Sequence, residues 1–274
     1  MKKSLLMGTM IFSSSLFAID NPPSLSILTQ YANTLVQSPS QTYMQLKNTK
    51  NDVKVSIDTY LSSTYDIANI PISYVYNNSF GLSAYISYAQ SNYATYKNSG
   101  ISDSTIEVSF NAGQFEDDVE FENNIFGLRY TFSTGYDALN LGSGSNSIAI
   151  FWDSTYIIND EWTAYGSLLW NIYLEDITID SSQYDLGSED ILWFGVKHQS
   201  LFNEKIETSL KLNWQGKYND IEAQNYDIVD ATLQWTSDKL IKNIPLNTGL
   251  KVPLWSSSNV DNEVLFFIGI GILF

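Results

Sequence analysis

Few side chains in this sequence could do covalent or metal chemistry. It has no cysteine and one histidine, which excludes disulfides, thiolate metal sites and multi-histidine metal centres. We therefore expect no metal and no cofactor. The histidine, His198, lies two residues before Ser200, so on a strand the two would share one face as a base and a nucleophile. A third group must orient such a base, and Asn203 is the only neighbour on offer. We expect no enzyme activity and keep lipid hydrolysis as an alternative.

Charged side chains are the larger group of candidates, and their positions follow a two-residue period. In the last eleven residues, Val264 to Phe274, both alternating faces are apolar. Such alternation predicts β-strands, and no apolar run reaches the roughly 20 residues that a membrane-spanning helix needs. Twelve strands are expected, beginning near Val53, Ile70, Phe80, Ile106, Ile125, Ser147, Trp162, Ile191, Ile206, Val229, Ile244 and Val264.

The charges fall on only one face of these strands. The more apolar phase of each strand holds no Asp, Glu, Lys or Arg, as a lipid-facing surface requires, because an Arg or Lys at the bilayer midplane costs about 2–4 kcal/mol. The opposite phase is predicted to line a pore: Lys54, Asp58, Glu107, Arg129, Asp153, Glu175, Lys197, Glu207, Lys211, Lys217, Asp230 and Lys251. These charges could form a basic ladder facing acids across a water-filled lumen, or ordinary salt bridges that fill a narrow barrel.

Aromatic residues and connection lengths point to the same fold. Trp152, Trp162, Trp170, Trp214 and Trp235 fall in the apolar phase and are predicted to lie at the membrane interfaces. Short connections such as 77–79 alternate with long polar ones such as 176–190, with 115–123 as an exception. The expected fold is all-β: a transmembrane antiparallel β-barrel of about twelve strands, preceded by a short helical or flexible segment.

The start of the chain divides into two expected segments before the barrel of residues 53–274. Residues 1–18 contain two lysines, an apolar stretch and a small residue, Ala18, in the order of a secretory signal peptide. Residues 19–52 are expected to be a periplasmic segment or a plug inserted into the lumen.

Two stretches resemble known families. The ending FFIGIGILF resembles the terminal strand of Gram-negative outer-membrane proteins, and this resemblance implies that Phe274 is a signal to the barrel-assembly machinery. The stretch Gly135 to Trp170 is similar to the transporter family labelled meta-pathway of phenol degradation, which implies a channel for small, often hydrophobic compounds. His198 and Ser200 have the spacing of outer-membrane phospholipases, but the following LFNEK departs from that family's pattern.

The acidic composition sets the expected partners. With 14 Lys and Arg against 30 Asp and Glu, the net charge of −16 argues against nucleic-acid binding. Most acids outside the strands are expected in external loops: Asp66, Asp103, Asp137, Asp176, Asp180, Asp185, Glu189, Asp190, Asp220, Glu222, Asp227, Asp261 and Glu263. We expect outer-membrane lipid, lipopolysaccharide, the assembly machinery and a small solute as partners. The expected function is a passive channel or transporter in the outer membrane of a Gram-negative bacterium; the alternative is a structural or adhesive surface barrel.

Overall fold

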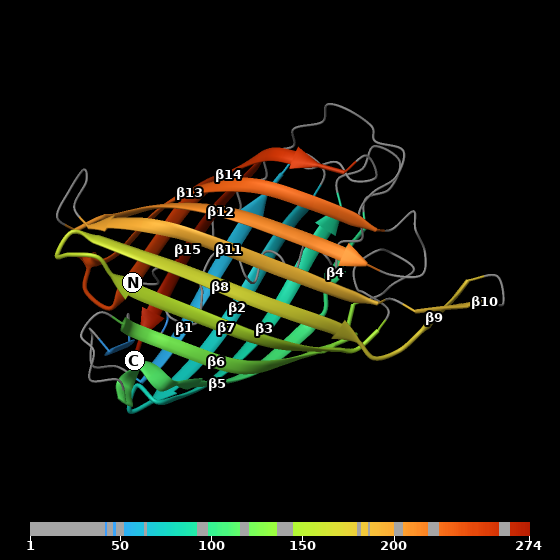
Figure 1. Ribbon diagram of the computed structural model, residues 1–274, viewed down its shortest axis with the longest axis horizontal. Coiled ribbons are helices and arrows are strands. Elements are labelled where there is room, and N and C mark those ends of the chain that lie inside the picture. The colour runs from blue at the N-terminus through green and yellow to red at the C-terminus, as the bar shows by residue number, and fades with distance from the viewer. Residues whose placement is uncertain are drawn as a thin grey trace, which may run out of the picture.

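The computed structural model describes residues 42, 46–47, 52–62, 65–91, 98–115, 121–135, 145–179, 182–185, 187–199, 205–218, 225–257 and 264–274. Within these ranges nearly all residues lie in strands (Figure 1). The strands are β1 (Val53–Leu61), β2 (Tyr65–Tyr76), β3 (Phe80–Ser91), β4 (Ser99–Ile101), β5 (Ser104–Asn111), β6 (Phe121–Phe132), β7 (Ser147–Ile157), β8 (Trp162–Tyr173), β9 (Ile177–Ile179), β10 (Ser182–Tyr184), β11 (Ser188–Gln199), β12 (Glu207–Tyr218), β13 (Tyr226–Ile241), β14 (Ile244–Ser256) and β15 (Leu265–Leu273). A short 3-10 helix, η1, spans Ala112–Phe115.

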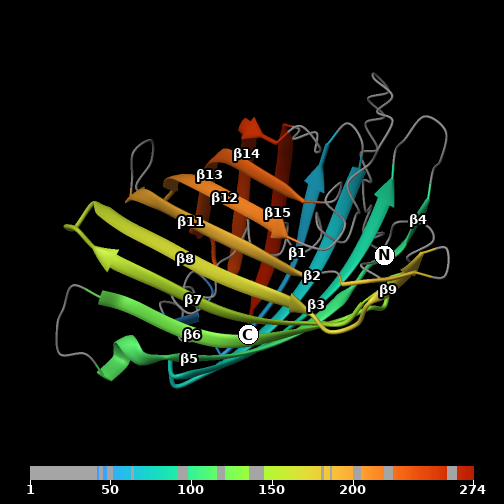
Figure 2. The same ribbon diagram turned by 45° about the vertical axis from the view of Figure 1, so that its right-hand side comes forward.

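Twelve of these strands close into one antiparallel barrel. Each pairs with the barrel strand before and after it in the chain, β1 pairs with the last strand, β15, and the β2–β3 pairing completes the ring. The two ends of the chain's barrel region therefore meet at one seam, where Lys54 is opposite Leu273. Figure 2 shows the strands tilted around a common interior. The predicted twelve-stranded transmembrane-type barrel is confirmed.

The connections differ between the two ends of the barrel. At the turn end, β2 and β3 are joined by three residues, and the positive φ angles of Asn77 (49°) and Asn78 (55°) suit the tight turn of a hairpin. The same end holds Phe274, η1 and the short β7–β8 and β13–β14 connections. At the opposite, loop end lie β4 and the separate β9–β10 hairpin (Figure 1). The sequence did not predict β4, β9, β10 or η1.

The polarity of the barrel wall is the reverse of that in a water-soluble protein: apolar side chains face outward and polar side chains face the interior. Along β15, exposed and buried residues alternate without a break, with Phe266, Ile268 and Ile270 pointing outward. Exposed large apolar side chains cover the outer face of the other barrel strands as well, whereas many inner-face side chains are Ser, Thr, Asn or charged. An apolar belt around a polar interior is the arrangement that suits a barrel in lipid. Among the described residues, no helix is long and apolar enough to cross a membrane.

Candidate functional site: the barrel lumen

The inner face carries all but one of the predicted pore-lining residues. The structure places Lys54 and Asp58 on β1, Glu107 on β5, Arg129 on β6, Asp153 on β7, Lys197 on β11, Glu207, Lys211 and Lys217 on β12, Asp230 on β13 and Lys251 on β14. All of them are buried except Glu207, which is half-buried. Glu175 lies beyond the end of β8, is exposed, and accepts a hydrogen bond of 2.9 Å from Asn146 Nδ2. That these residues line a conducting pore stays a prediction.

Several of these charges form pairs across neighbouring strands. Glu107 and Arg129 are directly opposite in the β5–β6 register, and Arg129 Nη2 lies 2.7 Å from Glu107 Oε2. Lys197 Nζ lies 3.3 Å from Glu207 Oε2, and Lys251 Nζ lies 3.8 Å from Asp230 Oδ2. The geometry therefore favours internal ion pairing over a free basic ladder.

Amide side chains hold some of the carboxylates in place from a second direction. Asn213 Nδ2 donates to Asp230 Oδ1 at 2.7 Å, and Asn247 Nδ2 donates to Asp58 Oδ1 at 3.1 Å. At Asp230 this bond occupies the oxygen that the Lys251 ammonium leaves open, and a hydrogen-bonded carboxylate is less costly to bury. The inner face is therefore a network of fixed charges and dipoles rather than a set of free charges.

A fully buried carboxylate, Glu189, was missed by the sequence analysis, which placed it in an external loop. It lies on the inner face of β11 at the loop end. Its Oε1 accepts hydrogen bonds from Gln215 Nε2 and from the hydroxyl of Tyr226, the latter at 2.9 Å, and the Tyr173 hydroxyl donates to Oε2 at 3.5 Å. Lys217 Nζ lies 4.9 Å from the centroid of the Tyr173 ring. The alternation Glu189, Ile191, Trp193 continues the inner phase and could have revealed this position.

Aromatic rings form a second component of the inner face. The Arg129 guanidinium lies 5.7 Å from the ring centroids of both Tyr85 and Phe151. Lys211 Nζ lies 5.0 Å from the Trp193 ring and 5.6 Å from the Tyr165 ring. At these distances the rings attract the cations through their quadrupoles. Since these side chains are nearly inaccessible, the described wall bounds a narrow interior rather than a wide aqueous channel.

Three described residues precede β1, within the segment 19–52. Thr42, Leu46 and Lys47 have helical backbone conformation. The side chain of Leu46 is only 1% exposed and belongs to one apolar cluster with the inner-face residues Val75, Ile125 and Leu273, which lie close to the turn end of β2, β6 and β15. Leu46 therefore contacts the interior of the barrel.

The predicted interface tryptophans lie on the outer face. Trp152, Trp162 and Trp170 are exposed, whereas Trp214 and Trp235 are half-buried. The longer course of β11 and β13 also brings two acids to the outer face at the loop end, Asp190 and Asp227, which the sequence analysis had placed in loops. Asp227 Oδ1 accepts hydrogen bonds from Trp214 Nε1 (3.2 Å) and the Tyr218 hydroxyl (3.1 Å). The role of the tryptophans at a membrane interface stays a prediction.

His198 and Phe274, the two remaining predicted positions, lie at the turn end. His198 Nε2 is 3.5 Å from Glu161 Oε2, and its ring meets that of Trp162 edge-on at 4.6 Å. Ser200 and Asn203 lie outside the described residues, so the structure does not place the hydrolase partners of His198. The Phe274 side chain points outward, and its main-chain N–H donates to the Val53 carbonyl at 2.9 Å.

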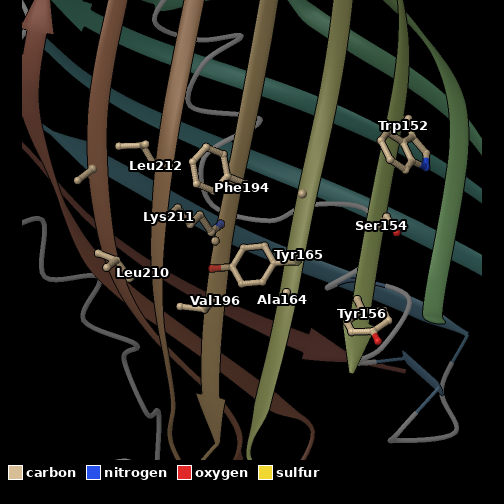
Figure 3. Close-up of a pocket in the computed structure, with 13 residues that line it drawn as sticks. Trp152, Ser154, Tyr156, Ala164, Tyr165, Phe194, Val196, Leu210, Lys211 and Leu212 are labelled. Carbon is tan, nitrogen blue, oxygen red and sulfur yellow. The ribbon is translucent and has the colours of Figure 1, made fainter. Parts of the chain in front are cut away.

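The outer face of the barrel has a groove where small side chains lie between large ones. A groove of about 610 Å³ lies over β7, β8, β11 and β12, with Ser154, Ala164 and Gly166 between Trp152 and Phe194. Figure 3 shows these strands, with Tyr165 and Lys211 reaching toward β11 from its two sides. The lining of the groove is almost wholly apolar, as lipid contact requires.

Comparison with known proteins identifies the fold. No family model matches the chain, and no curated protein matches it in sequence. Among solved structures, the COG4313 outer-membrane channel from Pseudomonas putida F1 is 12% identical, with 82% of this chain and 96% of that chain covered and a TM-score of 0.65. The NanC porin is 11% identical, with coverages of 81% and 100% and a TM-score of 0.56. The translocator domain of the autotransporter NalP from Neisseria meningitidis is 10% identical, with coverages of 88% and 100% and a TM-score of 0.51. At such low identities the likeness establishes that the chain has the fold of outer-membrane β-barrels.

Proposed function

We propose that this protein is an outer-membrane channel for the passive uptake of small solutes, hydrophobic or aromatic ones among them. The single observation that carries the proposal is the closed barrel whose outer face is apolar and whose inner face is polar and charged. Two of the three structural neighbours are named as a channel and a porin, and none is named as an enzyme.

The finer parts of this proposal rest on the sequence. The preference for hydrophobic or aromatic solutes follows from the resemblance of Gly135 to Trp170 to the phenol meta-pathway family, and residues 136–144 of that stretch lie outside the described residues. Insertion by the barrel-assembly machinery, contact with lipopolysaccharide and the Gram-negative outer membrane as location belong to the same proposal.

Electrophysiology tests the channel proposal directly. The mature chain from residue 19, reconstituted in planar bilayers, should show discrete conductance steps, and a variant that begins at residue 52 should conduct at least as well. The control is the same protein denatured before addition, which should give no steps. If neither form conducts, the channel proposal fails and a structural or adhesive barrel takes its place. Lipid hydrolysis by the wild-type protein that is lost in His198→Ala would instead support the hydrolase alternative.

A further inference from the structure

Three inner-face glycines each lie directly opposite an aromatic residue on the next strand. Gly127 on β6 is opposite Phe151 on β7, Gly195 on β11 is opposite Tyr165 on β8, and Gly249 on β14 is opposite Phe267 on β15. The first two pairs lie on four consecutive strands, β6, β7, β8 and β11, and the third lies elsewhere in the wall, on β14 and β15. Direct cross-strand neighbours on one face of a sheet are close enough for their side chains to interact.

In two of the pairs the ring occupies the space that a side chain on the glycine would need, and in the third the ring borders that space. A Cβ atom built on Gly127 would lie 2.2 Å from Phe151 Cζ, and one built on Gly249 would lie 2.3 Å from Phe267 Cζ. On Gly195 the nearest atom would be the Leu210 carbonyl oxygen, and the hydroxyl oxygen of Tyr165 would lie 3.0 Å away. The rings therefore lean across the glycines and along the wall, instead of standing perpendicular to it as strand side chains ordinarily do.

Cations contact two of these rings as well. Arg129, two residues after Gly127, lies 5.7 Å from the Phe151 centroid, and its charge is balanced by Glu107. Lys211 is opposite Gly195 on the other side from Tyr165, so Tyr165 and Lys211 meet over this glycine (Figure 3). Each ring is thus held by a glycine beneath it and, for two of the three, by a cation beside it.

We propose that Gly127, Gly195 and Gly249 set the width of the lumen by holding the rings of Phe151, Tyr165 and Phe267 against the barrel wall. A ring displaced from its glycine can move only toward the barrel axis, because the strand backbone blocks the outward direction. In a narrow barrel a phenyl or phenol group turned inward obstructs much of the passage. This inference deepens the proposed function and rests on it, since a width matters only if solutes pass.

The test is a double-mutant comparison at the first pair. Gly127→Ala should lower the single-channel conductance by roughly two-fold or more, because the displaced ring narrows the pore. Phe151→Ala alone should leave the conductance unchanged or raise it, and Gly127→Ala combined with Phe151→Ala should match Phe151→Ala alone. Gly166→Ala is the matched control: it lies on the outer face of β8, where a Cβ would meet its nearest atom, the Trp193 carbonyl oxygen, at 3.4 Å. This variant should conduct like the wild type.

A second readout separates this inference from the channel proposal. A Cβ on Gly127 would also approach the Val108 carbonyl oxygen at 2.6 Å, so the substitution could strain the backbone independently of the ring. The urea midpoint of unfolding in detergent decides between these causes. Gly127→Ala should lower the midpoint in the wild-type background and leave it unchanged in the Phe151→Ala background.

Two results would overturn the inference. One is that Gly127→Ala lowers the conductance or the urea midpoint by the same amount with and without the Phe151 ring, or prevents folding in both backgrounds. The contact with the Val108 carbonyl would then explain why residue 127 is glycine. The other is unchanged conductance in Gly127→Ala. A wild-type protein that does not conduct in any form would remove the channel proposal, while the urea comparison would still show whether the glycines hold the rings.

Discussion

At the scale of single residues, the ion pair between Arg129 and Glu107 should contribute strongly to stability. Arg129 is 7% and Glu107 2% exposed, and Nε and Nη2 of the arginine both donate to Glu107 Oε2, at 3.1 and 2.7 Å. Glu107→Gln leaves a buried guanidinium without its counter-charge, which costs about 3–5 kcal/mol. We expect that loss in the free energy of unfolding, measured by urea titration in detergent.

The control for this prediction is a second ion pair of the same lumen. The Lys197 side chain is 11% exposed, but the Glu207 carboxylate beside it is 33% exposed, so water that reaches this carboxylate can also solvate the Lys197 ammonium when the partner charge is lost. Glu207→Gln should therefore cost about 1 kcal/mol or less. A similarly small loss for Glu107→Gln would contradict the expectation and would mean that water reaches Arg129 from inside the barrel.

Individual residues show what the sequence can and cannot predict about the lumen. The two-residue period placed Arg129, Lys211 and Asp230 on one face, because successive side chains along a strand point to opposite faces of the sheet. It could not pair them, because pairing depends on register between strands that are distant in sequence. Glu189 was missed for a related reason: β11 begins three residues before the apolar run that identified it. The role of Gly127 emerges only when Phe151 is known to be its neighbour.

At the scale of elements, the long strands were predictable and the short ones were not. The outer face of each barrel strand must be apolar where a barrel meets lipid, and all twelve strands have eight residues or more, which is long enough for the pattern to be recognised. β4 and the β9–β10 hairpin have three residues per strand, too few for a period to be recognised. The register shift of β13 between Ser237 and Ile241 likewise has no signature in the sequence, because a bulge is defined by the partner strand.

The element before β1 offers a prediction about the entrance at the turn end. Leu46 is buried in one apolar cluster with Val75, and we expect this segment to bring cysteines at the two positions close enough to form a disulfide under mild oxidation. The chain has no cysteine of its own, which makes the cross-link easy to assign. Leu46→Cys with Val75→Cys should shift in mobility on electrophoresis without reductant. If the segment acts as a plug, oxidation should also lower the conductance and reductant should restore it.

The matched control uses the opposite face of the wall. Leu82 on β3 is exposed on the outside of the barrel, so Leu46→Cys with Leu82→Cys should not cross-link within one molecule. Equal cross-linking of both pairs would show that Leu46 is not confined to the interior. Efficient cross-linking of the inner pair with unchanged conductance would place Leu46 inside the barrel but reject a plug.

At the scale of the whole molecule, the net charge of −16 does not describe the lumen. The inner face of the described strands carries six bases and six acids: Lys54, Arg129, Lys197, Lys211, Lys217 and Lys251 against Asp58, Glu107, Asp153, Glu189, Glu207 and Asp230. The excess of acids must therefore lie outside this set. Charges at a pore mouth attract or repel ions through solvent, where salt screens them, whereas charges along the wall lie next to the passing ion and are screened less. The salt concentration should therefore distinguish the contributions of the two sets of charges to ion selectivity.

Ion selectivity measured at two salt concentrations tests this division of charge. In a gradient around 0.01 M KCl, where the Debye length is about 30 Å, acidic residues outside the lumen should enrich K⁺ at the mouth and give a reversal potential that favours cations. Around 1 M KCl, where the Debye length falls to about 3 Å, the preference should nearly vanish, because the lumen itself is balanced. Glu189→Gln removes one acid and should shift the reversal potential toward anions at both concentrations, since Lys217 in the same loop-end region of the lumen keeps its charge. An anion preference of the wild type at low salt would mean instead that the lumen bases dominate, and a cation preference that persists in 1 M salt would place the uncompensated acids inside the pore.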